Sequence, residues 1–160
     1  PSLVGSEMCI RDSYAPRQYG LSQQHKHLPE VQHVCGLSEA PIFMPIVDDY
    51  YSGMEVTVGI HSRLCRKPIS IDKVQQVLED FYKDSTIITV VPFTDTSNTG
   101  MLHANQLSNT DSMKIYVTGN DERIMVHAIF DNLGKGASGA AVQCMNIALG
   151  LPEETGLALG

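Results

Sequence analysis

The chain has 160 residues and a formal net charge of -7, with 11 Lys and Arg against 18 Asp and Glu. This length is enough for one hydrophobic core, and the negative charge disfavours nucleic acid as a partner. Hydrophobic residues make up 42% of the chain but never form the run of about 18 that spans a membrane, and the four separated cysteines indicate a reducing compartment, so we expect a cytoplasmic globular domain.

The first residue is Pro rather than Met, and we expect that further polypeptide precedes it. Residues 1–13 have no clear period and look like translated sequencing-adaptor sequence joined to a genuine reading frame. A native, poorly ordered terminus is the alternative. We therefore expect a non-native or disordered leader over residues 1–13 and one domain over residues 14–160.

The domain begins with a polar segment that reads as a loop or a short strand end. Pro29 and the following acidic residue suit the first turn of a helix, which we expect over Pro29–Cys35, stopped by Gly36. Two histidines, at positions 25 and 27, are then predicted in the loop just before it. Residues 41–47 are apolar with an internal proline, as in an irregular edge strand.

The middle of the chain predicts a strand, a helix and a second strand. Residues 53–60 alternate between apolar and polar side chains, which is typical of a strand with one buried face. Ser70 is a good N-cap, and residues 87–91 form a β-branched run ended by a proline. Residues 94–110 are polar and predict a surface loop. Apolar residues three and four positions apart predict one helix face that packs on a sheet: Ile71, Val74, Val77, Leu78 and Phe81.

The last third predicts a hairpin and a helix. Residues 113–117 and 123–130 alternate around a turn at residues 119–121, which indicates an antiparallel pair. The glycine-rich residues 134–139 lead into residues 140–149, where small side chains on several sides predict a buried helix. The fold class that follows is α+β, with a mixed or antiparallel sheet and helices on one face.

His25 and His27 are the candidates for acid/base chemistry, because imidazole titrates nearest neutral pH. Glu30 lies within one helical turn and is suited to orient an imidazole or keep it protonated. Two spaced histidines are also common on surfaces. Zinc is the competing ligand, with His33 and Cys35 nearby, but no HExxH or CxxC companion is present, so we expect no metal.

The glycine-rich segment precedes a predicted helix, so its N–H groups are candidates to bind a phosphate or carboxylate. It matches neither a Walker loop nor GxGxxG. The simpler interpretation, which the spacing favours, is that the glycines let the helix begin close to a packed sheet. Cys144, within the predicted buried helix, is expected to be inert, and Cys35 is only a slightly better nucleophile.

Two segments resemble motifs of one enzyme family. Residues 25–31, HKHLPEV, resemble the H(R/K)HxPE(I/V) motif of N-acetyl-gamma-glutamyl-phosphate reductases, and residues 131–146 resemble their C-terminal DNLxKGAxGxAVQxxN signature. Between them, residues 50–54 match the family at the start of its first long strand. The order and separation of the motifs argue against chance agreement. The resemblance identifies residues 14–160 as the C-terminal substrate and dimerisation domain of such a reductase.

The resemblance implies a fold like the C-terminal domain of the glyceraldehyde-3-phosphate and aspartate-semialdehyde dehydrogenases. It also implies the NADPH-dependent reduction of N-acetyl-glutamyl 5-phosphate to N-acetyl-glutamate 5-semialdehyde, with release of phosphate, in arginine biosynthesis. The nucleophilic cysteine and the dinucleotide-binding loop of the family belong to its N-terminal half, so we expect this fragment alone to be inactive. The implied partners are a small-molecule substrate and further copies in a homodimer or homotetramer.

Residue roles follow from the same resemblance. His27 is expected to handle the proton of the thiohemiacetal oxygen, with His25 as a substrate contact or alternate base. Glu30 is expected to orient a histidine, and Tyr19 to line the substrate pocket. Three residues are expected to face NADP, which the N-terminal half mainly binds: Asn132, Lys135 and Gly136.

Two alternatives stay open. The first is a related reductase that acts on N-acetyl-aminoadipyl phosphate or aspartyl phosphate. The second is a non-catalytic binding or oligomerisation module. The second is weakened because an isolated half exposes the small-residue face of its last helix.

Overall fold

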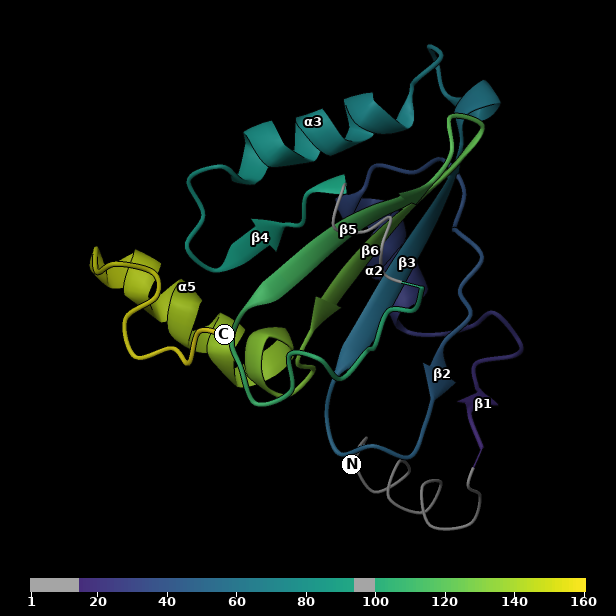
Figure 1. The fold of residues 1–160 in the computed structure, drawn as a ribbon. Coiled ribbons are helices and arrows are strands. Elements are labelled where there is room, and N and C mark those ends of the chain that lie inside the picture. Colours follow the sequence, from purple (N-terminus) through teal and green to yellow (C-terminus); the bar gives the residue numbers. More distant parts are fainter. Residues whose placement is uncertain (1–14, 94–99) are drawn as a thin grey trace. The chain divides into compact units, whose positions relative to one another are not determined.

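The computed structural model describes residues 15–93 and 100–160 of the chain. The predicted leader over residues 1–13, and residues 94–99 of the predicted polar loop, lie outside the described residues. The chain divides into two compact units, Pro1–Tyr51 and Ser52–Gly160. The first unit contains a two-stranded sheet and the second a four-stranded sheet (Figure 1).

The first unit is built from one strand pair and one helix. β1 (Arg17–Gln18) pairs antiparallel with β2 (Ile46–Val47), so the strand predicted over residues 41–47 is limited to its last two residues. The helix α2 covers His27–Val34. Gly36, at φ 61°, follows it in the left-handed conformation and ends it, as predicted.

The prediction that His27 lies in the loop before α2 is wrong, because the helix begins at this residue. His25 explains the earlier start, since it accepts two N–H groups of the first turn. Its Nδ1 atom accepts the His27 N–H at 3.3 Å, and its carbonyl oxygen accepts the Leu28 N–H at 3.0 Å. These bonds satisfy donors that have no partner within a helix.

The second unit is organised around a mixed sheet in the order β3-β6-β5-β4. β3 (Met54–His61), β6 (Arg123–Phe130) and β5 (Met113–Gly119) are antiparallel neighbours, whereas β4 (Ile88–Val90) runs parallel to β5. The predicted hairpin and the α+β fold class are confirmed. Residues 100–110, the described part of the predicted polar loop, contain turns and neither helix nor strand.

α3 (Ile71–Tyr82) begins at the predicted N-cap, where the Ser70 hydroxyl accepts the Lys73 N–H at 3.3 Å. The Asp121 carboxylate, in the turn between β5 and β6, accepts the Ile71 N–H at 2.9 Å. The helix is thereby tied to the end of the hairpin. Its inner face forms a hydrophobic core with the strands, centred on four buried residues: Ile71, Val74, Val117 and Ile124.

The predicted buried face of α3 is wrong in its second half. Val77 and Phe81 are exposed, Phe81 to 77%, because the helix contacts β4 and β5 and leaves this flank uncovered. Gln75, predicted on the solvent face, is buried. Its side-chain amide donates to the Val91 carbonyl oxygen at 3.0 Å. This carbonyl group, next to β4, thereby gains a hydrogen-bond partner.

The expected burial of the apolar face of β3 is also wrong for this chain. Met54, Val56 and Val58 are exposed, Val58 to 55%. They share a face of the sheet with the core residue Ile124, but α3 lies over β4 and β5 at the other edge. One helix covers only about two strands, given a helix diameter of ~10 Å and a strand spacing of ~4.8 Å.

The glycine-rich segment is helical and not an open turn. A π-helical turn, η2 (Gly134–Ser138), runs directly into α5 (Gly139–Leu149). Within η2, the Gly136 N–H donates to the Asp131 carbonyl oxygen at 2.7 Å. Most N–H groups that were candidates for anion binding are therefore used inside the unit.

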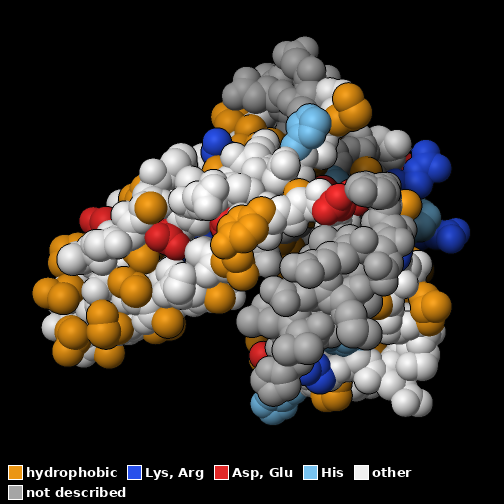
Figure 2. Space-filling model, turned by 90° about the horizontal axis from the view of Figure 1, so that it is seen from below, with side chains coloured by type: hydrophobic (Ala, Val, Ile, Leu, Met, Phe, Trp, Pro, Cys, Tyr) orange, Lys and Arg blue, Asp and Glu red, His pale blue; other side chains and the backbone are white. Residues whose placement is uncertain are grey.

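The prediction that the last helix is buried is wrong, and so is the expected burial of Cys144. α5 extends away from the four-stranded sheet (Figure 1), and hydrophobic side chains gather where this helix lies, at the left of the view (Figure 2). Met145, for example, is 53% exposed. The helix turns a polar residue inward instead, since the Asn146 amide donates to the carbonyl oxygens of Glu153 and Thr155 in the C-terminal tail.

The Asp131 carboxylate joins three segments of the second unit. It is 2% exposed, and its two oxygens accept from the Ser52 hydroxyl at 2.7 Å and from the N–H groups of Asn109, Leu133 and Gly134 at 2.5, 2.7 and 2.9 Å. Burial by itself raises the pKa of Asp131, but these four hydrogen bonds to the charged form together lower it below its ordinary value of 3.8.

We expect Asp131→Asn to lower the free energy of unfolding at pH 7 by about 3 kcal/mol, because an amide NH2 group would face backbone donors. A carboxylate with a lowered folded pKa stabilises the fold above its unfolded pKa, and this stabilisation is lost as the pH falls through the folded pKa. The difference between the two proteins should therefore shrink at acid pH. Urea unfolding at pH 7 and pH 3 measures it, and an equal loss from Asp84→Asn at an exposed position would contradict the prediction.

Candidate functional site

The first unit brings three of the predicted site residues together. The ring centroids of His25 and His27 lie 4.7 Å apart, and the Tyr19 ring lies 5.7 Å from His25, edge to face. The end of β1 places Tyr19, whose N–H donates to the Pro45 carbonyl oxygen at 3.0 Å, and the start of α2 places His27. The site is a small aromatic cluster with two titratable rings.

Glu30 lies in the first turn of α2, as expected. Within the described residues, its carboxylate forms no hydrogen bond or ion pair with either imidazole. Its side chain is exposed. The role of orienting a histidine stays a prediction.

Sequence reasoning missed two residues of this cluster, Phe43 and Gln23. The Phe43 ring centroid lies 5.0 Å from that of His25 and 6.5 Å from that of His27. The Gln23 side chain makes two hydrogen bonds to the backbone of Phe43, from Nε2 to the carbonyl oxygen at 2.7 Å and from the N–H to Oε1 at 2.9 Å. No periodic pattern connects a loop residue with an apolar segment 20 positions later.

The two imidazoles differ in what they offer a ligand. His25 Nδ1 accepts the His27 N–H, so a neutral His25 ring carries its hydrogen on Nε2 and can donate it. The His27 ring is the more exposed of the two and is suited to exchange a proton with a bound molecule. The cluster supplies acid/base groups and hydrogen-bond donors but no nucleophile.

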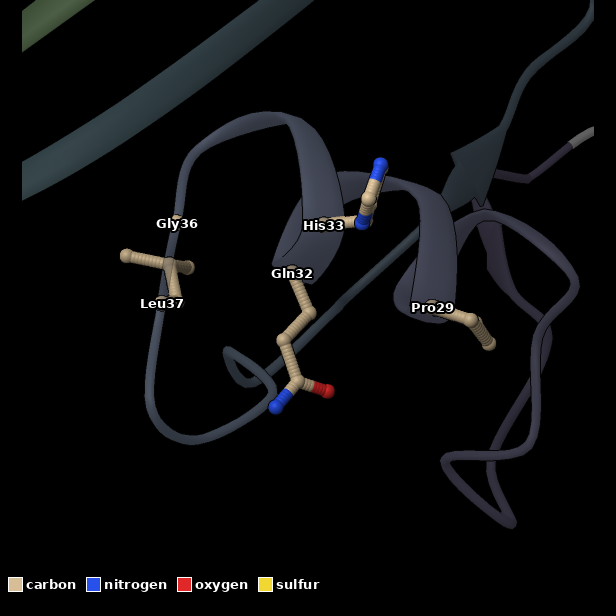
Figure 3. Close-up of a pocket in the computed structure, with 5 residues that line it drawn as sticks. All are labelled: Pro29, Gln32, His33, Gly36 and Leu37. Atoms are coloured by element: carbon tan, nitrogen blue, oxygen red, sulfur yellow. The ribbon is translucent and has the colours of Figure 1, made fainter.

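A hollow lies along α2 and has a volume of about 430 Å³. Figure 3 shows the side chains of its two polar residues, Gln32 and His33, leaving the helix in different directions. The Gln32 amide donates to the Ser38 carbonyl oxygen at 3.1 Å. The polar groups do not converge, so the hollow offers a ligand little beyond its shape. Five residues line it: Pro29, Gln32, His33, Gly36 and Leu37.

The predicted cofactor residues lie in the second unit, in or beside η2. The Asn132 side-chain oxygen accepts the Gly53 N–H at 2.8 Å, and Lys135 Nζ donates to the Gln143 side-chain oxygen at 3.0 Å. The ammonium group of Lys135 has further N–H donors for a ligand. Contact of these residues and Gly136 with NADP stays a prediction.

The glycines of this segment are explained by close packing, as the simpler interpretation expected. A Cβ atom on Gly134 would lie 2.6 Å from the Thr110 carbonyl oxygen, and one on Gly136 would lie 3.1 Å from the Phe130 ring. A Cβ atom on Gly139 would overlap the Asp111 carboxylate. A side chain at these positions would push η2 and α5 away from their neighbours.

His127 forms a polar network on the sheet face opposite α3, which the sequence did not predict. Its Nδ1 atom lies 2.8 Å from Glu55 Oε1 and 3.0 Å from Thr57 Oγ1, and its Nε2 atom lies 2.8 Å from Thr118 Oγ1. The residue is only 8% exposed. With both ring nitrogens paired, His127 links three neighbouring strands and has no group left for a ligand.

Metal ligands and membrane spans were searched over residues 15–93 and 100–160. No group of three or more His, Cys, Asp or Glu side chains there is arranged to hold a metal ion. No helix in these ranges combines the length and the apolar character needed to cross a bilayer. The two-histidine cluster is the arrangement best suited to chemistry in this part of the chain.

We expect NMR of the histidine ring nitrogens to show the neutral His25 ring as the Nε2–H tautomer. The backbone N–H of His27 occupies Nδ1 as a donor, which requires a lone pair there. His33, exposed on the same helix, is the internal control and should show no such fixed tautomer. A protonated Nδ1 on the neutral His25 ring would contradict the hydrogen bond.

Known proteins match most of the chain, across both units. The family model described as "Semialdehyde dehydrogenase, dimerisation domain" matches residues 6–132. N-acetyl-gamma-glutamyl-phosphate reductase 2 of Nostoc sp. is 40% identical over 144 residues, covering 87% of this chain and 45% of that protein. The reductases of Burkholderia lata and Brucella ovis are 39% and 41% identical, over 84% and 82% of this chain and 44% and 43% of their own lengths. The chain therefore spans less than half the length of these relatives.

Proposed function

The chain belongs to the semialdehyde dehydrogenase family, in its dimerisation domain, and on this basis we propose that it is the acid/base part of an NADP-dependent N-acetyl-gamma-glutamyl-phosphate reductase. The observation that carries the proposal is the convergence of His25 and His27, in the segment that resembles the family's HxHxPE motif, with the Tyr19 ring beside them. The identity of about 40% to proteins of that name supports it.

In the proposed reaction, N-acetyl-glutamyl 5-phosphate is reduced to the 5-semialdehyde and phosphate is released. A cysteine elsewhere in the complete enzyme forms the acyl intermediate, and NADPH, held mainly by that other part, supplies the hydride when bound. His27 transfers the proton at the substrate oxygen, because its ring is exposed and adjacent to a second imidazole. His25 Nε2–H and the Tyr19 ring hold the substrate beside it.

Among the cofactor candidates, Lys135 is the one whose side chain is suited to contact NADP. The N–H groups of Leu133 and Gly134 are bound by Asp131, so they do not form a phosphate cradle. Lys135 offers a flexible cation with spare donors, which suits a polar or anionic group of NADP. Asn132 and Gly136 fix the backbone from which this lysine extends.

The surface of α5 supports a partner polypeptide. The helix, Gly139–Leu149, contains no charged residue, and its exposed side is apolar or small. An uncharged exposed helix face of this kind is typical of an interface. We place the cofactor-binding part of the enzyme against α5, and a second copy of the chain elsewhere on this domain, in a homodimer or homotetramer. The free thiols Cys35, Cys65 and Cys144 agree with a cytoplasmic enzyme.

Replacing His25 and His27 together by Asn in the complete enzyme is expected to lower kcat at least about a hundredfold, since general acid/base catalysis contributes ~10² to 10⁴. NADPH oxidation with the acyl phosphate measures the change. His33→Asn, at an exposed position on the same helix, is the matched control and should leave kcat unchanged. Parental turnover by the double variant would remove the proposal.

Met145→Lys tests the interface on α5. In the 160-residue chain the side chain is already half exposed, so the free energy of unfolding should change by no more than about 0.5 kcal/mol. In the complete enzyme the lysine would be buried at the interface, and we expect the free energy of unfolding to fall by about 2 kcal/mol or more. Equal small effects in both proteins, measured by urea unfolding, would place the interface elsewhere.

A further inference from the structure

Gln23 has a backbone conformation that its residue type does not favour. Its φ angle is 57°, in the left-handed region where glycine is the usual residue. It lies in an exposed turn closed by a hydrogen bond from its N–H to the Gly20 carbonyl oxygen at 3.0 Å. Glycine would fit this turn without strain, but it would lack the contacts that the glutamine side chain makes.

The Gln23 side chain binds both polar backbone groups of Phe43. The amide donates to the Phe43 carbonyl oxygen at 2.7 Å and accepts its N–H at 2.9 Å, which satisfies both polar groups of that residue. Two bonds to one residue fix its orientation as well as its distance. The position of the Phe43 ring is therefore set by a side chain 20 residues earlier.

The Phe43 ring in turn packs on the histidine pair. It lies 5.0 Å from the His25 ring, at 49°, and 6.5 Å from the His27 ring, at 69°. His25 is thus held between Phe43, the Tyr19 ring and the His27 N–H. Rotation of its imidazole would break at least one of these contacts, so its Nε2–H points in one direction.

We infer that Gln23 and Phe43 are positioning residues for the two imidazoles, with Gln23 acting as a clamp that fixes the Phe43 ring against them. The inference rests on the proposed function and adds to it two residues that do not touch the reacting atoms. Their effect is on orientation, which matters because displacing a catalytic group by about 1 Å can lower a rate about a hundredfold.

The first test is Gln23→Gly in the complete reductase, with Gln24→Gly as the matched control. Both substitutions add the same backbone freedom to the loop, but only the first removes the clamp, and glycine suits the φ angle of position 23. We expect kcat to fall about tenfold to a hundredfold because the proton donor His27 is misplaced, and KM to rise by a smaller factor because His25 contacts the substrate. In an enzyme whose double histidine variant has lost its turnover, equal kcat values for the two variants, or a change in KM alone, would overturn the inference.

The second test varies the ring itself. Phe43→Tyr keeps an aromatic ring on the same backbone and should retain kcat to within about threefold, whereas Phe43→Leu removes the flat contact and should match Gln23→Gly. In Phe43→Leu the Gln23 side chain can still bind the backbone of residue 43, but there is no aromatic ring left for it to position. Adding Gln23→Gly to Phe43→Leu should therefore lower kcat little further. Fully multiplicative losses would show that the two residues act independently and would contradict the clamp.

A readout without catalysis separates this inference from the proposed function. NMR signals of the His25 and His27 rings in the same protein should shift in Gln23→Gly and stay in place in Gln24→Gly. If the double histidine variant keeps its turnover but the ring signals respond in this way, the proposed function fails and the positioning role stands. Ring signals that Gln23→Gly leaves unchanged would contradict the positioning role, whatever the activity measurements show.

Discussion

The buried carboxylate of Asp131 is the constraint on which the second unit depends. It lies at the end of β6 and accepts from Ser52 before β3, from Asn109 in the loop before β5, and from the first N–H groups of the glycine-rich segment. The four hydrogen-bond donors compensate the free-energy cost of removing the Asp131 charge from water. An uncharged residue at this position would not need four donors. These bonds hold the start of η2 to the segments before β3 and β5. The same bonds explain why the glycine-rich segment cannot serve as a phosphate loop.

The histidine cluster of the first unit is organised on a different principle, by contacts between rings. His25 uses its Nδ1 atom and its carbonyl oxygen to begin α2, which leaves only Nε2 for a ligand, while His27 is exposed in the first turn. The proposed catalytic pair is thus combined with a helix start, and local backbone bonds and Phe43 hold it in place. Such a cluster can move protons but cannot attack an acyl carbon, so the proposed reaction depends on a thiol from another part of the enzyme.

The sequence predicted most elements because local signals decided them. Ser70 capped α3 where expected, the alternation in β5 and β6 gave the hairpin, and Gly36 ended α2. Burial was predicted less well, since apolar spacing shows which residues share a face and not what covers it: Val58 and Met145 remain exposed in this chain. The histidines could be found from their motif. Gln23 and Phe43 could not, because their role rests on a φ angle and on contacts between distant loop residues.

We propose that this chain contributes proton transfer and substrate contacts, while other polypeptide contributes the thiol and holds the NADPH that would supply the hydride. The most direct test measures NADPH oxidation with N-acetyl-glutamyl 5-phosphate for the 160-residue chain alone and after addition of the N-terminal part of the reductase. We expect no turnover by the chain alone and measurable turnover by the mixture. Turnover by the chain alone, at a rate that the added part does not raise, would contradict it.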